Sequence, residues 1–116
     1  MIKTSVLAYL KQLIIYTRIG ANMKETKNKT NWDLVNLKNL EGICAVRSFG
    51  VKKYKDPENW KNVAPEDYSS AAIRHLAEMQ DKGLYSRDAE SGLLHIDHLA
   101  TNAYFLSYFA RINSVR

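Results

Sequence analysis

The sequence of 116 residues has little of what a disulfide-bonded or membrane-spanning protein needs. Its one cysteine, Cys44, lies in an apolar stretch and cannot form an intrachain disulfide, which fits a reducing compartment. Near the amino terminus the longest uncharged run, residues 4–10, is far shorter than the roughly 20 apolar residues of a membrane span. Lys11 and Gln12 interrupt any signal-peptide core. We therefore expect a cytoplasmic protein with no membrane segment, no cleaved signal and no membrane partner.

The sequence also lacks a basic folded region, although its formal net charge is +5. The excess lies in residues 1–30, which hold six basic residues and one acidic residue, whereas residues 31–116 hold eleven of each sign. A duplex-binding module needs a basic surface on its folded part. We expect no nucleic acid partner.

No segment alternates between apolar and polar residues as a strand does, and no internal repeat is present. The apolar residues instead recur at spacings of three and four, which predicts an all-α fold, a small helical bundle. Short chains bury a smaller fraction of their surface than long ones, so we expect oligomerisation, as a homo-oligomer, to complete the core. Residues 1–32 are predicted to form an amphipathic helix (1–22) and a polar linker, and residues 33–116 the helical domain.

Three core helices are predicted within that domain. The first spans about residues 36–55 and ends before Asp56-Pro57. The second begins at Pro65, carries acidic residues in its first turn and ends at Lys82-Gly83. The third spans about residues 93–112 with Ser91 as a possible cap, and is apolar nearly all round, which predicts a central position in the bundle or in an oligomer interface.

Several polar side chains of the two later helices face the apolar side. His95, His98 and Asn102 share one stripe of the last helix, and His75 lies on the core side of the second. All three histidines of the chain are therefore predicted to converge. Each must be hydrogen-bonded or ligate a metal, because an unsatisfied buried polar group costs about 1–3 kcal/mol. Core histidines that tie helices together and metal-ligating histidines both remain open.

Charged residues near these helices have two interpretations each. Asp88 and Glu90 could supply oxygen ligands for Mg²⁺ or Mn²⁺, or could cap the last helix. Arg74 could form a surface ion pair with Glu78, or could bind phosphate through its guanidinium fork. The run at residues 52–55, Lys-Lys-Tyr-Lys, could be a solvated helix end or could hold a polyphosphate.

Taken together, these motifs resemble one family, the dATP/dGTP diphosphohydrolases of phages, over about residues 33–108. The resemblance rests on their order and spacing: Phe49-Gly50-Val51-Lys52-Lys53-Tyr54, Asn59-Trp60, Ala72-Ile73-Arg74-His75-Leu76, the run from Asp88 to His98, and Asn102-Ala103-Tyr104-Phe105-Leu106. It implies a fold related to MazG-like nucleotide pyrophosphohydrolases. It also implies hydrolysis of a purine deoxynucleoside triphosphate to the monophosphate and pyrophosphate with Mg²⁺ or Mn²⁺. For a phage protein, the compartment would be the host cytoplasm.

The resemblance assigns roles to residues by position, for attack of a metal-activated water on the α-phosphorus. Glu90 and His75 are the expected catalytic residues. The remaining assignments are substrate binding by Lys53, Tyr54, Trp60, Arg74 and Asn102, and metal binding by Asp88, Glu90, His95 and His98.

The chain departs from the family pattern in its first core helix. Members of the family often carry a glutamate just upstream of the glycine and lysine-tyrosine motif, where this chain has Ala45 and only Glu41 nearby. The departure motivates a second hypothesis, a nucleotide-binding protein that sequesters its ligand with little hydrolysis. A third hypothesis is a structural or interaction protein whose histidines are core polar ties.

Overall fold

The computed structural model describes residues 8, 10, 11 and 29–114, so most of the predicted amphipathic helix of residues 1–22 lies outside the described residues. Contacts divide the chain into two units, residues 1–36 and 37–116. In the first unit the short 3-10 helix η2 (Trp32–Leu34) follows Asn31, whose side-chain oxygen accepts a hydrogen bond from the Asp33 amide at 3.1 Å. The predicted boundary after residue 32 stays a prediction.

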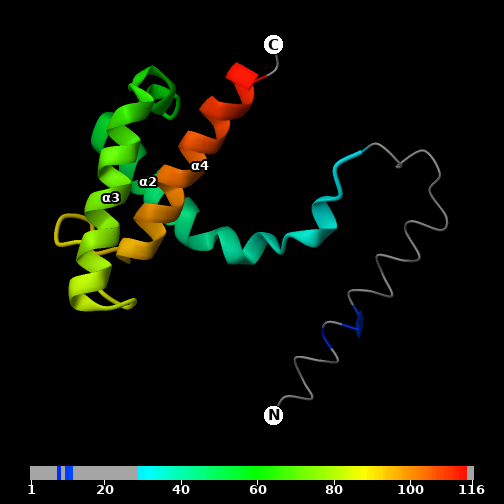
Figure 1. Ribbon diagram of the computed structural model, residues 1–116, viewed down its shortest axis with the longest axis horizontal. Helices are drawn as coiled ribbons and strands as arrows, with labels where there is room; N and C mark the ends of the chain where they lie inside the picture. Colours follow the sequence, from blue (N-terminus) through cyan, green and yellow to red (C-terminus); the bar gives the residue numbers. More distant parts are fainter. Residues whose placement is uncertain (1–7, 9, 12–28, 115–116) are drawn as a thin grey trace. The chain divides into compact units, whose positions relative to one another are not determined.

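The second unit is an all-α bundle, as predicted (Figure 1). Within residues 29–114 no strand forms, and the only β-type pairing is an isolated bridge between Arg87 and Leu94. No described helix combines the length and apolar character needed to cross a membrane. In chain order the elements are η3 (Leu37–Leu40), α2 (Glu41–Tyr54), η4 (Asn59–Asn62), α3 (Pro65–Lys82) and α4 (His95–Ser114).

Helix α4 packs along α3 and also against α2, which confirms its predicted central position (Figure 1). The ring of Tyr68, at the start of α3, lies 4.7 Å from Phe105 in the middle of α4. The ring of His75, two turns further along α3, lies 4.5 Å from His98 near the start of α4. The two helices are therefore antiparallel neighbours.

Where α2 packs on α4, a glycine leaves room for a carboxylate. A Cβ atom at Gly42 would collide with the Asp97 carboxylate, so a larger residue would require that side chain to rotate away. Within the described part of the chain the buried residues, which are at most 8% exposed, all lie on α4: His95, Thr101, Asn102 and Phe105. Three of these four are polar, so the best-buried part of the described chain is not a simple apolar core.

Helix α3 has the predicted bounds. Pro65 occupies the first turn, where its missing amide hydrogen costs nothing, and acidic residues follow it at the positive end of the helix dipole. At the other end Gly83 adopts φ 101°, a conformation that favours glycine, and its amide donates to the Met79 carbonyl.

The other two helices begin later than predicted. Residues 37–40 form a 3-10 turn rather than the start of α2, and Leu37 is 73% exposed, so no packing surface stabilises an α-helical turn there. Helix α4 begins at His95 rather than residue 93, because the preceding residues hydrogen-bond to the loop. The Leu93 carbonyl accepts from the Asp88 amide at 2.8 Å, and the Ser91 hydroxyl accepts from the Leu93 amide at 3.1 Å. Ser91 thus caps the turn before the helix.

Candidate active site

A cavity of about 420 Å³ lies among α2, η4, α3, α4 and the loop before α4. Its α4 wall consists of His98, Thr101, Asn102 and Phe105, which are spaced by three, one and three residues and so share one face of the helix. From α2, residues at the same spacing line the opposite wall, among them Val46, Phe49, Gly50 and Lys53. The volume lies within the range of small-molecule binding sites.

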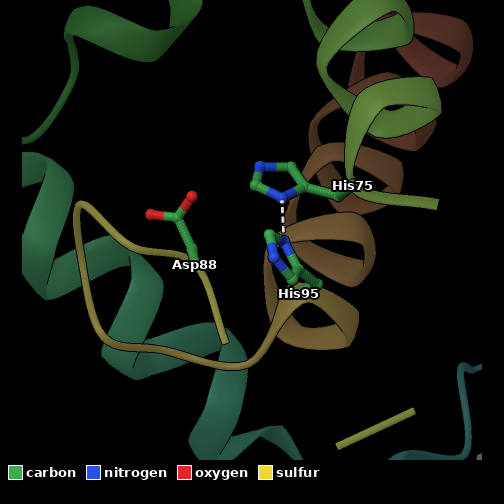
Figure 2. Close-up of side chains that lie close together, drawn as sticks. All are labelled: His75, Asp88 and His95. Carbon is green, nitrogen blue, oxygen red and sulfur yellow. Dashed lines mark hydrogen bonds between the residues drawn. The ribbon is translucent and has the colours of Figure 1, made fainter. Parts of the chain in front are cut away.

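The three histidines meet at one end of this cavity, which confirms the predicted convergence. The Nδ1 atoms of His75 and His95 are 2.8 Å apart, so one imidazole donates its Nδ1–H to the unprotonated Nδ1 of the other (Figure 2). The ring of His98 stacks on His75 at 4.5 Å with an interplanar angle of 8°. His95 is only 5% exposed, so this contact is shielded from bulk water.

Asp88 comes to the histidines from the loop that precedes α4. Figure 2 shows the Asp88 side chain on the part of the loop that lies beside His75 and His95. One suitable donor atom from each of these three residues lies within 4.8 Å of the other two. The Asp88 carboxylate accepts a hydrogen bond from the Ser91 amide at 2.9 Å, and the Ser91 hydroxyl lies 2.7 Å from His98 Nε2. These bonds fix the loop against α4 and turn Asp88 towards the histidines.

The environment sets the protonation of these groups. Burial lowers the pKa of His75, the neighbouring His98 and His95 lower it further, and Asp88 opposes them. Burial likewise lowers the pKa of His98 against the opposing charge of Asp88. Burial acts to raise the pKa of Asp88, but the hydrogen bonds from Ser91, together with the nearby His98 and His75, keep that pKa below its usual value. Near neutral pH the imidazoles of His75 and His98 are therefore neutral beside the ionised carboxylate of Asp88, a state that can bind a cation.

Glu90 lies on the same loop but pairs with a different helix. Its carboxylate accepts a hydrogen bond from Lys53 Nζ at 2.5 Å across the cavity mouth, and this bond is the largest cause of a raised pKa at Lys53. Both side chains are largely exposed. The pair links α2 to the loop and leaves the Lys53 ammonium and the Glu90 carboxylate within reach of a ligand.

Arg74 adds a second cation to the same region. It lines the cavity and has no hydrogen bond or ion pair with any residue in the described part of the chain. Glu78, the predicted i, i+4 partner, instead forms an ion pair with Lys82 at 2.7 Å. The surface ion pair between Arg74 and Glu78 is therefore not formed, and the guanidinium is available to an anion.

The other end of the cavity is aromatic. Trp60 stacks on Phe105 with ring centroids 4.6 Å apart and an interplanar angle of 18°, and Tyr68 lies 4.7 Å from the same phenylalanine. The Tyr68 hydroxyl donates to the Trp60 carbonyl at 2.6 Å, which fixes η4 on α3. The Arg47 guanidinium lies over Trp60 and Phe105 and donates to the Pro57 carbonyl at 2.6 Å. Flat, rigid surfaces of this kind suit a planar ring.

Asn102 lies between the two ends of the cavity. Its side chain lines the cavity, the residue is only 8% exposed, and its amide makes no hydrogen bond with the described residues. Every described polar side-chain atom that is closed off from solvent has a hydrogen-bond partner. The Asn102 amide has none among the described residues, so it must be open to the cavity. A well-buried amide open only to a cavity is suited to reading the polar groups of a ligand.

All of the residues predicted from the resemblance line this cavity except His95, which lies behind His75. The structure brings His75 together with Asp88 and His95, and it places Glu90 with Lys53 rather than in that group. Arg47, Tyr68 and Ser91 were not predicted as site residues. The spacing of Tyr68 seven residues before His75 on one helix face was a signal that could have found it.

The family model described as dATP/dGTP diphosphohydrolase, N-terminal, matches residues 20–114. No curated protein and no solved structure matches the chain significantly. The match spans the whole described bundle and every residue of the cavity, so the chain belongs to the dATP/dGTP diphosphohydrolase N-terminal family.

Proposed function

We propose that this protein binds a purine deoxynucleoside triphosphate in the cavity and hydrolyses it, with Mg²⁺ or Mn²⁺, to the monophosphate and pyrophosphate. One observation carries the proposal: a single cavity joins an aromatic end at Trp60 and Phe105 to a charged end at His98 and Asp88. His98 and Phe105 are seven residues apart on α4, which is about 10 Å along a helix axis. A nucleotide has its planar base at one end and its phosphates at the other, which matches the aromatic and charged ends of the cavity.

The aromatic end is the proposed base site. Phe105 supports the rings of Trp60 and Tyr68, which line the cavity. Aromatic rings favour stacking with a base, and a purine presents a larger face than a pyrimidine. Asn102 lies one helical turn from Phe105, with an amide that can both donate and accept hydrogen bonds. We assign it to the nucleoside, as a contact that fixes the orientation of the stacked base.

The charged end is the proposed phosphate and metal site. Lys53 and Arg74 provide two cations, but Lys53 already faces Glu90, and Asp88 adds a second carboxylate. The positive charges of Lys53 and Arg74 therefore do not balance the negative charges of a bound triphosphate. The donor set of imidazole nitrogens and carboxylate oxygens within 4.8 Å of one another fits a divalent ion.

The proposed chemistry divides among the residues at this end. A divalent ion, when bound, supplies Lewis acidity towards the attacking water and the phosphate oxygens. Glu90 is the proposed general base, since its carboxylate lies at the cavity mouth, where the triphosphate would draw Lys53 away from it. His75 is neutral near pH 7 because burial lowers its pKa, so it can accept a proton or bind the ion. Lys53 and Arg74 stabilise charge on the β and γ oxygens.

A second candidate function is nucleotide binding with little hydrolysis. Among the described residues, α2 gives the cavity no carboxylate: Glu41 does not line it, and Ala45 stands where the family often has a glutamate. All cavity acids come from loops, namely Asp56, Asp88 and Glu90. A site that binds its ion with fewer carboxylates would retain binding better than turnover.

The test is product analysis with a matched binding measurement. The purified protein is incubated with each dNTP and NTP and with Mg²⁺ or Mn²⁺, and products are separated by ion-exchange chromatography. Glu90→Gln is compared with Asp81→Asn, a substitution of an exposed acid that does not line the cavity. The proposal expects a purine dNTP to yield its monophosphate and pyrophosphate, with loss of turnover only in Glu90→Gln.

Two other outcomes would replace the proposal. Nucleotide that binds tightly but is recovered intact would support the binding protein. Absence of both binding and turnover, with Arg74→Ala and Glu90→Gln indistinguishable from the unmodified chain, would leave the histidines as ties between α3 and α4.

A further inference from the structure

The histidine cluster differs from a typical magnesium site in its donor atoms. Mg²⁺ prefers oxygen ligands, keeps several waters and is usually held by one or two carboxylates with substrate phosphates. Two of the three converging donors here are imidazole nitrogens, those of His75 and His95, and only Asp88 supplies oxygen. Imidazole favours first-row transition metals and zinc.

We infer that His75, His95 and Asp88 form a binding site for a transition-metal ion, one that holds Co²⁺, Zn²⁺ or Mn²⁺ in preference to Mg²⁺. The inference specifies the metal of the proposed function and rests on it for the ion's role in hydrolysis, but not for binding itself. The site needs no nucleotide, because all three donors come from the chain.

The arrangement of the two imidazoles supports a shared ion. Their Nδ1 atoms face each other at 2.8 Å, with a single proton between them (Figure 2). Two imidazole nitrogens on one tetrahedral ion, each about 2.0–2.1 Å from it, lie about 3.4 Å apart. The rings therefore need to separate by about half an ångström for an ion to take the place of the shared proton.

The surroundings hold the three donors in place. His95 is 5% exposed on the first turn of α4, and His98 stacks on the face of His75 and limits its rotation. Ser91 donates its amide hydrogen to Asp88 at 2.9 Å and contacts His98 Nε2 at 2.7 Å. His98 is thereby committed to the Ser91 hydroxyl, so it acts as a positioning residue and not as the third nitrogen ligand. Outer contacts of this kind orient ligands in known metal sites.

The inference is tested on the full chain, freed of metal by EDTA and dialysis, without any nucleotide. Isothermal titrations with Co²⁺, Zn²⁺, Mn²⁺ and Mg²⁺ are expected to give one site per chain, with Co²⁺ bound at least about 100-fold more tightly than Mg²⁺. Bound Co²⁺ should show visible d–d absorption. Bound Mn²⁺ should show ¹⁴N modulation in pulsed electron paramagnetic resonance, a signature of imidazole that requires no variant.

Variants locate the site. His75→Gln and Asp88→Asn are each expected to weaken Co²⁺ binding by about 10- to 100-fold or more, while Asp81→Asn, at an exposed acid outside the cluster, leaves it unchanged. Circular dichroism checks that each variant is folded. Similar affinity for Mg²⁺ and Co²⁺, absence of ¹⁴N modulation, or unchanged binding in both ligand variants would overturn the inference.

The inference and the proposed function can fail separately. Tight Co²⁺ binding with the nitrogen signature but no dNTP hydrolysis would leave the metal site standing and refute the enzyme. Hydrolysis supported by Mg²⁺ in a protein that binds no transition metal would support the enzyme and refute the metal site.

Discussion

The amide of Asn102 leads to a prediction in which stability and ligand affinity change independently. The residue is 8% exposed, yet its side chain makes no hydrogen bond with the described chain and opens onto the cavity. Leucine has a similar shape and needs no partner. Asn102→Leu removes a polar group that gives nothing to the folded state, so we expect unfolding free energy to stay constant or rise by up to about 1 kcal/mol.

The same substitution is expected to weaken nucleotide binding. A lost hydrogen bond that leaves a ligand group unpaired costs about 1–3 kcal/mol. Since about 1.4 kcal/mol corresponds to a factor of ten, the Kd should rise about 5-fold to 140-fold. The assays are urea denaturation of the free protein and isothermal titration with a purine dNTP.

The neighbouring residue provides the matched control. Thr101 is 2% exposed and also lines the cavity, but its hydroxyl donates to the Asp97 carbonyl at 2.8 Å. Thr101→Val removes a bond made within the protein, so it should lower stability by up to about 1 kcal/mol with little effect on nucleotide affinity. If Asn102→Leu instead destabilised the protein by several kcal/mol and left the Kd unchanged, the amide would be a structural group and the reasoning would be wrong.

Three further predictions concern the core, the histidines and the salt bridge. Phe105→Ala removes a 7%-exposed ring that contacts three other aromatic residues, and urea denaturation should show a loss of about 3–5 kcal/mol. In metal-free protein, stability should be full above pH 6.5 and should fall as the pH drops below it. The unfolded histidines ionise near 6.5, whereas His75 and His98 in the folded state resist protonation to a lower pH; urea midpoints that do not fall between pH 7.5 and 5 would contradict this. Lys53→Met breaks an exposed pair with Glu90, so the urea midpoint should barely move, while affinity should fall more for a triphosphate than for the matching nucleoside.

The bounds of a helix could be predicted from the sequence where a single residue type starts or ends it. Pro65 and Gly83 fix the bounds of α3 through the missing amide hydrogen and the positive φ, and both effects are legible in sequence. The start of α4 was not predictable in this way. Residues 93 and 94 have helical periodicity, but the Leu93 carbonyl accepts from the Asp88 amide and the His95 amide donates to the Ser86 carbonyl. Such contacts depend on how the loop folds back.

The candidate site also combines features that local sequence predicts with features that depend on tertiary contacts. Helical spacing was enough to predict that His75, His95 and His98 converge, because periodicity places each on the inner face of its helix. Spacing could not predict that Glu90 pairs with Lys53, 37 residues away, or that Glu78 takes Lys82 and leaves Arg74 to the cavity. Long charged side chains have several partners in reach, and the choice among them is made by tertiary packing.

The composition of the buried region leads to a last prediction. The best-buried described residues all lie on α4, three of the four are polar, and both His95 and Asn102 face the site. A bundle whose interior is its binding site forgoes apolar packing there, so ligand should contribute a large share of its stability. A ligand at 100 times its Kd adds about 2.7 kcal/mol. With about 4–8 °C per kcal/mol for a domain of this size, a purine dNTP with Co²⁺ should raise the Tm by about 10–20 °C. Differential scanning fluorimetry measures this shift, and Asn102→Leu should reduce it at fixed ligand concentration. An unchanged Tm at high ligand concentration would mean that the folded protein does not bind the nucleotide, and the reasoning from the cavity would be wrong.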